Sequence, residues 1–214
     1  MATDDPFHSR IIQHITHFSN LPLILQSGGL MCDAHLAQGT AVSIAYGEIK
    51  QRRAVKRVMC APGGFVSEYV PFYFAPRSPM LYAIHCGCVP QYSGGQSEII
   101  YLVSSIATVR KLRLQFVFTD GHPVVGATRF FNNLADLTEV DWDVMKARTW
   151  HNTSEDPDRK RRRQAEFLIH HFCPWQAIDL VAVYDTDMRM IVQSLLASAA
   201  VQQPMVTVRR YWYY

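Results

Sequence analysis

The sequence predicts an α+β domain with a split or highly twisted mixed β-sheet core and flanking helices. Predicted strands and helices follow one another without the regular strand–helix–strand repeat that marks a parallel sheet. Hydrophobic residues make up 49% and aromatic residues 12% of the 214 residues, which is enough apolar surface for one core of ordinary size. We therefore expect residues 1–214 to form a single domain, without internal repeats or a linker.

The first predicted unit is a strand followed by a short helix. Residues 13–19, QHITHFS, alternate in polarity and are rich in β-formers, which is typical of a strand. Asn20 is expected to cap a helix over 21–27, with Pro22 in its first turn and a glycine pair after its end.

A second helix is predicted over residues 40–59. Ile44 and Val55 are eleven positions apart and would share a face of this helix. Arg53 would then lie on the opposite side, pointing to solvent or to a ligand.

An aromatic strand comes next. Residues 68–76, EYVPFYFAP, predict a buried strand, and Pro71 places it near an edge or a bulge. Ser78 and Pro79 are a typical cap and first residue of a helix. Arg77 would therefore lie beside a helix N-terminus, where anions are favoured.

The remainder alternates between strands and helices around one long irregular segment. The predicted elements are strands at 98–105, 114–120, 164–172, 177–185 and 205–214, and helices at 106–112 and 186–200. Residues 121–163 contain at most two short helices, near 132–138 and 141–147. A connection of this length is typical of a functional loop.

The positive charges are clustered. Net charge is only +3, but cations concentrate in residues 50–57, 110–113 and 158–164. A local positive field suits a groove or patch for phosphate, although for any single run a solvated surface is the better interpretation.

Several familiar kinds of site find no support in the sequence. The signatures GxxxxGK[ST], GxGxxG, GxSxG and HExxH are absent. Cys86-x-Cys88 has no second ligand pair at zinc-like spacing, and His14 and His17 would point to opposite faces of their strand. We expect no metal and, without an apolar run of ~18 residues, no membrane span.

The cysteines indicate a compartment. Five cysteines, an odd number without framework spacing, occur in a chain with no predicted signal peptide. A reducing cytoplasm is the simplest expectation.

Polar residues at the edges of apolar strands are the candidates for chemistry. Glu166 is the strongest, because it comes three residues after the end of a cationic run, Arg159 to Arg163, and opens an apolar strand. A carboxylate there must be exposed at the strand end or held by partners, since an unpaired buried charge is costly. The others are His14, Thr16, Asn20, Arg53, Tyr73, Arg77 and His122.

Six stretches, in order, together resemble a known family. They are HITHFSNLPLIL…GGL, SIAYGEIKQRR, YVPFYFAPRSPMLYAI, GGQSEIIYLVSS, FVFTDGH and DRKRRRQAEFLIHHFCPW, followed by the terminal YWYY. This pattern resembles the DarT family of DNA ADP-ribosyltransferase toxins, the toxin half of DarTG toxin–antitoxin systems.

The resemblance implies an ADP-ribosyltransferase-like fold with NAD in a cleft between two small sheets. It also implies transfer of ADP-ribose from NAD to ring nitrogen N3 of thymine in single-stranded DNA, with Arg53 and Glu166 as the catalytic residues. Leu23 stands where the family has an NAD-binding glycine, and Met31 where it has a leucine. The implied NAD-binding residues are His14, Ile15, Thr16, Asn20, Leu23, Met31, Tyr73, Arg77 and Met80.

The implied DNA contacts lie in a substrate-recognition loop over residues 122–166. Basic side chains there would hold phosphates, and aromatic or histidine side chains would receive an unstacked base. These residues are His122, Trp150, His151, Arg159, Lys160, Arg161, Arg162 and Arg163. The implied partners are single-stranded DNA and a macrodomain antitoxin of the DarG type, and we expect a monomer.

The chemistry of the residue types agrees with this resemblance. A carboxylate such as Glu166 can stabilise positive charge that develops on the NAD ribose, and a cation such as Arg53 favours a deprotonated thymine. Two alternatives stay open. One is another acceptor, namely guanine, RNA or protein; the other is a non-catalytic nucleic-acid-binding module in which Glu166 only pairs with cations.

Overall fold

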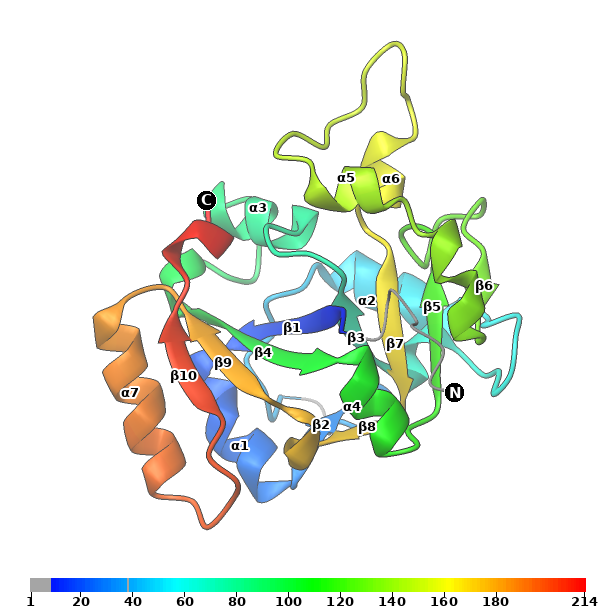
Figure 1. Ribbon diagram of the computed structural model, residues 1–214. Coiled ribbons are helices and arrows are strands. Elements are labelled where there is room, and N and C mark those ends of the chain that lie inside the picture. The colour runs from blue at the N-terminus through cyan, green and yellow to red at the C-terminus, as the bar shows by residue number, and fades with distance from the viewer. Residues whose placement is uncertain (1–8, 38) are drawn as a thin grey trace.

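The computed structural model describes residues 9–37 and 39–214 (Figure 1), so the first residues, where no signal peptide is expected, lie outside it. The strands are β1 Ile11–His17, β2 Gly29–Met31, β3 Tyr69–Tyr73, β4 Ile99–Ser105, β5 Phe116–Thr119, β6 Phe130–Phe131, β7 Glu166–His170, β8 Phe172–Pro174, β9 Leu180–Val183 and β10 Met205–Val208. The α-helices are α1 Leu21–Gln26, α2 Gly47–Val55, α3 Pro79–His85, α4 Ile106–Lys111, α5 Trp142–Lys146, α6 Arg159–Arg162 and α7 Thr186–Ala197.

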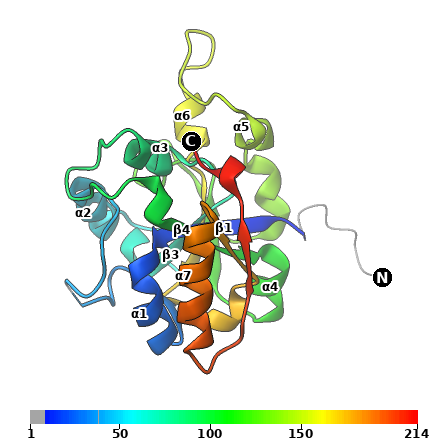
Figure 2. The same cartoon turned by 90° about the vertical axis from the view of Figure 1, so that its left-hand side faces the viewer.

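These elements form one large mixed sheet covered on both faces. Its eight strands have the order β10-β9-β4-β1-β3-β7-β5-β6, and β2 and β8 form a separate pair. β10 and β9 are parallel and the other pairs antiparallel. Viewed from the β10 end, α7 is in front, with α1 and α2 to one side of the strands and α4 to the other (Figure 2). The prediction of an α+β fold is confirmed.

The large sheet is split between β1 and β3. β1 pairs with β4 along its whole length, but with β3 only at Gln13 and Tyr73. Beyond this point the two strands diverge, and Pro71, which has no N–H to donate, lies on the diverging part of β3. The Nδ1 of His14 bridges the gap to the Pro71 carbonyl oxygen at 2.8 Å. The sheet therefore consists of two halves that open a space between them.

The predicted helix over 40–59 is much shorter in the structure. It starts at Gly47, and residues 40–46 are irregular because the side chain of Asn20 binds the backbone of Val42. Ile44 is buried outside the helix, while Val55 is 74% exposed, so the two do not share a helical face. The predicted cap is also corrected, since the Asn20 side chain makes no capping hydrogen bond to α1.

The other differences lie where the chain turns within a few residues. The last strand ends at Val208 instead of Tyr214, because Arg210–Trp212 form a 3-10 turn that brings Tyr213 into the core. The two short helices predicted near 132–138 and 141–147 do occur, as the 3-10 helix Leu134–Glu139 and as α5. The short elements β2, β6, β8 and α6 are absent from the prediction.

The small sheet depends on a glycine. A Cβ atom on Gly29 would clash with the Cys173 carbonyl oxygen and the Phe172 ring. Gly29 therefore lets β2 and β8 approach each other closely.

In the part of the chain that the structure describes, no helix has both the length and the hydrophobicity that crossing a bilayer requires.

Candidate active site

A cavity of about 390 Å³ lies at the split in the sheet. β1 and β3 supply its inner wall, and α1, α2, α3 and β7 supply residues around it. This volume is in the range of small-molecule binding sites. Sequence-predicted site residues that line it are His14, Ile15, Thr16, Asn20, Leu23, Met31, Arg53, Tyr73, Met80, His122, Lys160 and Glu166.

A buried ion pair lies in the wall of this cavity. Nη1 of Arg53, on α2, donates to Oε2 of Glu166, on β7, at 2.8 Å. The two residues are only 7% and 3% exposed. Glu166 is thus not a solvated residue at a strand end, because a partner 113 positions away in the sequence holds it.

The same pair keeps unused hydrogen-bonding capacity. Nη2 of Arg53 is buried and has no hydrogen-bond partner among the described residues. Burial lowers the pKa of Arg53, but the Glu166 carboxylate opposes burial and the net pKa is raised. A permanently charged donor beside a cavity suits a ligand that brings an oxygen acceptor to it.

The strand start fixes where the Glu166 carboxylate lies. Glu166 is the first residue of β7, and its N–H donates to Oγ1 of Thr119 at 3.0 Å. It is directly opposite Tyr73 of β3. Burial, followed by the Glu166 charge, raises the pKa of Tyr73, so its phenol stays neutral and keeps its hydrogen. The cavity wall therefore places one carboxylate, one cation and one hydroxyl together.

The two histidines of β1 have different surroundings. Nδ1 of His14 binds the Pro71 carbonyl, which only accepts, so Nδ1 carries the hydrogen. Burial lowers the pKa of His14, which leaves Nε2 as a neutral acceptor in a residue that lines the cavity. His17 instead contacts Ser19 and Glu98 and does not line the cavity.

His122 joins the long loop to the cavity. Its backbone N–H donates to the Arg161 carbonyl at 3.0 Å, and Nδ1 accepts from the N–H of Val124 at 3.3 Å. Burial lowers the pKa of His122, although the nearby Glu166 charge opposes this shift. The residue is therefore a neutral imidazole that carries its hydrogen on Nε2.

Asn20 shapes the cavity by holding its outer wall. Its Nδ2 donates to the Val42 carbonyl at 2.9 Å and to Oγ1 of Thr16 at 3.0 Å, and its Oδ1 accepts from the Val42 N–H at 2.8 Å. These bonds fix the irregular segment 41–46, which contributes six lining residues. Asn20 thus acts mainly by positioning other groups.

Replacing Asn20 should weaken binding at this cavity without unfolding the protein. In Asn20→Ala the segment 41–46 must be ordered by the ligand itself. For NAD, the ligand that the family resemblance implies, we expect the affinity to fall roughly 10-fold, the equivalent of about one good hydrogen bond. Isothermal titration with NAD measures this. Asn132→Ala is the control, because the Asn132 side chain is exposed and donates a hydrogen bond to the Ala61 carbonyl, away from the cavity. Equal affinity in the two variants would contradict the positioning role.

The long loop is anchored by the cations that end it. Arg161 pairs with Asp120 at 3.0 Å and Asp158 at 2.7 Å, and Arg162 pairs with Asp141 and Asp156. The segment between α5 and α6 projects away from the rest of the molecule (Figure 1). These ion pairs hold the base of that projection on the body of the protein.

Two sequence-predicted contacts are corrected by the structure. Arg163 is 4% exposed and donates to the Pro76 carbonyl at 2.6 Å, so it is not available to a DNA phosphate. Arg77 is not a lining residue of the cavity, and its Nε donates to the Tyr213 carbonyl at 2.8 Å. The C-terminal tyrosines fold back onto this junction and occupy it.

The remaining predicted residues differ in accessibility. Lys160 lines the cavity and is exposed, and His151 is exposed on the projecting segment. Nε1 of Trp150 donates to the hydroxyl of Tyr214 at 3.1 Å, and its ring packs edge-on against Tyr82. Trp150 therefore belongs to an aromatic cluster with α3 and the C-terminus.

Sequence reasoning missed several lining residues. Val42, Asp33 and Lys50 all line the cavity, and Lys50 pairs with Asp33 at 3.2 Å. Val42 contributes through its backbone contact with Asn20, for which a sequence offers no signal. The terminal YWYY was expected to lie in a strand, and it carries no signal for the contacts of Tyr213 and Tyr214 with Arg77.

Comparison of the fold identifies the class of protein. The structure is similar to Thermus sp. 2.9 DarT in complex with NAD+, with a TM-score of 0.87 and 39% identity over 96% of this chain and 98% of that one. It is also similar to the same relative in complex with ADP-ribosylated ssDNA, with a TM-score of 0.91 and 41% identity over 96% and 97% of the two chains. The fold is that of an NAD-dependent ADP-ribosyltransferase.

Sequence comparison identifies the family. The DarT family, described as ssDNA thymidine ADP-ribosyltransferase, matches residues 13–214. The DNA ADP-ribosyl transferase of Thermus sp. (strain 2.9) is 42% identical over 204 residues, which cover 95% of each chain. The chain belongs to the DarT family.

Proposed function

We propose that this enzyme transfers ADP-ribose from NAD to N3 of thymine in single-stranded DNA, as the toxin of a toxin–antitoxin pair. The observation that carries the proposal is the buried Arg53–Glu166 pair in the wall of the cavity at the split in the sheet. When bound, NAD supplies the ADP-ribose by cleavage of its nicotinamide–ribose bond. Residues of this chain bind and orient the substrates and stabilise the charges that develop in the reaction.

Glu166 is the proposed stabiliser of positive charge on the ribose. Its carboxylate is fixed at the start of β7, and burial protects it from screening by water. Because Arg53 donates to one of the carboxylate oxygens, the other oxygen can accept a hydrogen bond from a hydroxyl group of the ribose.

Arg53 is proposed to act on the base. A guanidinium keeps its proton, so it is a poor general base, but its charge lowers the cost of a deprotonated thymine ring nearby. The unpartnered Nη2 could donate to a thymine oxygen at the same time. In this assignment the ion pair orients both charged groups before the substrates arrive.

The proposed NAD-binding residues are those of the sequence prediction that line the cavity. The unprotonated Nε2 of His14 and the neutral hydroxyl of Tyr73 supply an acceptor and a donor. Asn20 holds the wall over residues 41–46, and Arg77 acts indirectly, through the junction with the C-terminus.

The proposed DNA surface is the loop over residues 122–166, including the projecting segment between α5 and α6. Lys160 is its best candidate for a phosphate contact, because it is exposed, borders the cavity, and pairs with no acid in the part of the chain described. His122 lies at the cavity for contact with the target base, and Trp150 and His151 lie on the loop. Arg159 donates to the Thr149 carbonyl, and Arg161 and Arg162 are already paired, so these three mainly support the loop.

Removal of Lys160 should change the salt dependence of DNA binding. For Lys160→Ala we expect the slope of log affinity against log salt concentration to become shallower by about 0.7, the value for one phosphate contact to a single strand. Fluorescence anisotropy with a thymine-containing oligonucleotide at several salt concentrations measures the slope. Lys111→Ala, on α4, is the control. A slope that stays at the wild-type value would remove Lys160 from the interface.

One assay tests the proposed reaction. The protein is incubated with NAD and single-stranded oligonucleotides that differ only in whether they contain thymine, and mass spectrometry detects a gain of one ADP-ribose. An adduct is expected only on thymine-containing strands, and blocking N3 by methylation should abolish it. An adduct on guanine, on RNA or on protein, with none on thymine, would favour the alternative acceptors.

The proposal also covers the domain organisation, the oligomeric state, the compartment and the partner of the enzyme. Residues 1–214 act as one domain and as a monomer in the cytoplasm, and a macrodomain antitoxin is the proposed partner. The family resemblance supports the antitoxin, and the unpaired cysteine count supports the compartment. The alternative of a non-catalytic binding module is not favoured, because the family and its relatives are ADP-ribosyl transferases.

A further inference from the structure

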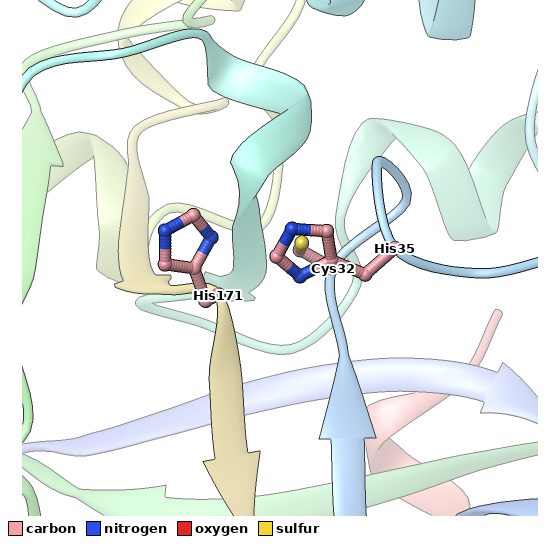
Figure 3. A group of neighbouring side chains, drawn as sticks. All are labelled: Cys32, His35 and His171. Atoms are coloured by element: carbon pink, nitrogen blue, oxygen red, sulfur yellow. The ribbon is translucent and has the colours of Figure 1, made fainter.

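Three potential metal ligands gather at one end of the small β2–β8 sheet, outside the residues assigned to the reaction. They are Cys32, His35 and His171 (Figure 3). One ligand atom of each side chain lies within 4.8 Å of those of the other two. No other such group of three or more histidines, cysteines or acidic residues occurs in residues 9–37 and 39–214.

The small sheet brings the distant ligands together. β2 and β8 pair from Gly29 and Pro174 to Met31 and Phe172, and the N–H of Cys32 continues this ladder to the His171 carbonyl at 2.9 Å. Residues opposite each other in an antiparallel pair have Cβ atoms about 4.5–5.5 Å apart. The pairing of two short strands thus fixes the distance between Cys32 and His171.

The third ligand comes from the turn that follows β2. Cys32 and His35 are separated by two residues, the spacing with which a turn presents two ligands to one zinc ion. The rings of His35 and His171 stack with centroids 4.8 Å apart and an angle of 23°. His35 therefore already lies over the other two side chains.

One of the potential ligand atoms has no hydrogen-bond partner among the described residues. Nδ1 of His171 is buried without a hydrogen-bond partner among the described residues, which is costly for a polar atom. His171 also has a φ of 58°, in the left-handed region that a histidine adopts only at a cost. A metal ion would satisfy the ring nitrogen that this backbone conformation directs into the structure.

We propose that Cys32, His35 and His171 bind a zinc ion, or a similar divalent cation that prefers sulfur and imidazole ligands. One thiolate and two imidazoles are typical zinc ligands, with a water as the fourth. Zinc with usual bond lengths would place the ligand atoms roughly 3.3–3.6 Å apart, and the exposed side chain of His35 can rotate to reach that distance. This proposal differs from the prediction of no metal that was made from the sequence. That prediction rested on Cys86-x-Cys88 and did not take the spacing of Cys32 and His35 into account.

The proposed site lies behind the cavity wall, apart from the residues assigned to the reaction. Met31, Asp33 and Leu36 line the cavity, whereas their neighbours Cys32 and His35 carry the proposed ligands. A metal ion there would tie the segment 31–36 to β8. It needs no part in the transfer reaction, so the inference stands whether or not the proposed acceptor is correct.

Cobalt substitution tests the ligands directly. The untagged full chain, stripped of metal by a chelator, is titrated with Co²⁺ and then Zn²⁺ while absorption is recorded. We expect one equivalent of Co²⁺ to produce the sulfur-to-cobalt charge-transfer band and the intense visible bands of a tetrahedral site, and Zn²⁺ to displace it. Mass spectrometry of the native chain with Zn²⁺ gives the stoichiometry independently.

Variants decide which residues hold the ion. Cys32→Ser should remove the charge-transfer band, and His35→Ala should weaken Zn²⁺ affinity by more than the roughly 10–100-fold that loss of a supporting hydrogen bond costs. His35 is exposed, so its variant stays informative even if Cys32→Ser fails to fold. The control is Cys86→Ser/Cys88→Ser, which removes the exposed cysteines. A band that survives in both test variants, or disappears in the control, would overturn the proposal, as would a wild-type chain that binds no Zn²⁺.

Discussion

Glu166→Gln should lower the rate of ADP-ribose transfer by at least about 10²–10³-fold, the loss typical when one electrostatic stabiliser of a transition state is removed. Glutamine keeps the shape of the side chain and an oxygen that can still accept from Arg53. It removes the negative charge that the proposed mechanism places beside the ribose. The effect should therefore appear in kcat, measured by the yield of adduct over time at saturating NAD and DNA.

A second measurement separates catalysis from binding and folding. Isothermal titration should show that Glu166→Gln still binds NAD, because the lining residues from β1, α1 and α3 are unchanged. Glu139→Gln is the control, since Glu139 is also paired with an arginine, at 2.6 Å from Arg129, but lies outside the cavity lining. Equal rates for Glu166→Gln and Glu139→Gln would rule out Glu166 as the catalytic carboxylate.

The elements that the sequence predicts well are those with a long local pattern. The strand at 98–105, the helix at 106–112 and the helix at 186–200 each carry a hydrophobic period or a cap, and all three occur close to their predicted bounds. Ser78 caps α3 as expected, by accepting from the N–H of Leu81. In these segments the local preference and the tertiary structure agree.

The prediction fails where a distant side chain determines the backbone. Residues 40–46 have a helical pattern, but the bonds between Asn20 and Val42 keep them irregular across the cavity. β2 and β8 contain only three residues each, and their pairing depends on the fit of Gly29 against Cys173. Neither effect can be recognised from the local sequence pattern.

In the candidate site, too, the sequence indicates some features and only the fold determines the others. The residue types and the junction before β7 draw attention to Glu166, and the resemblance to the family points to Arg53. That the two form one buried ion pair is a property of the fold, since they come from α2 and β7. Only the structure shows which cations of the run 159–163 are accessible, because Arg163 is buried while Lys160, three residues earlier, is exposed.

The Arg53–Glu166 pair should be strongly coupled in stability. Arg53→Met and Glu166→Leu each leave one buried charge without its partner, and we expect each to lower the free energy of unfolding by about 3–5 kcal/mol. The double variant buries no unpaired charge, so its stability should return to within about 1–2 kcal/mol of the wild type. Urea unfolding of all four proteins gives the coupling energy.

The exposed pair Arg129–Glu139 is the reference for this double-mutant cycle. Its side chains are 60% and 43% exposed, and such pairs contribute about 0.2–1 kcal/mol. If the cavity pair showed a coupling energy no larger than this reference, the buried charges would have to be hydrated, and the proposed electrostatic roles would lose their basis.

The double variant also distinguishes a pair kept for folding from a pair kept for chemistry. Replacing a buried ion pair by apolar residues is often neutral for stability, so stability alone does not account for these two charges in the cavity wall. We expect Arg53→Met/Glu166→Leu to be folded and inactive, with no adduct on thymine-containing DNA. A stable double variant that still modified thymine would assign the chemistry to other residues, whereas a stable and inactive one would show that the pair serves the reaction.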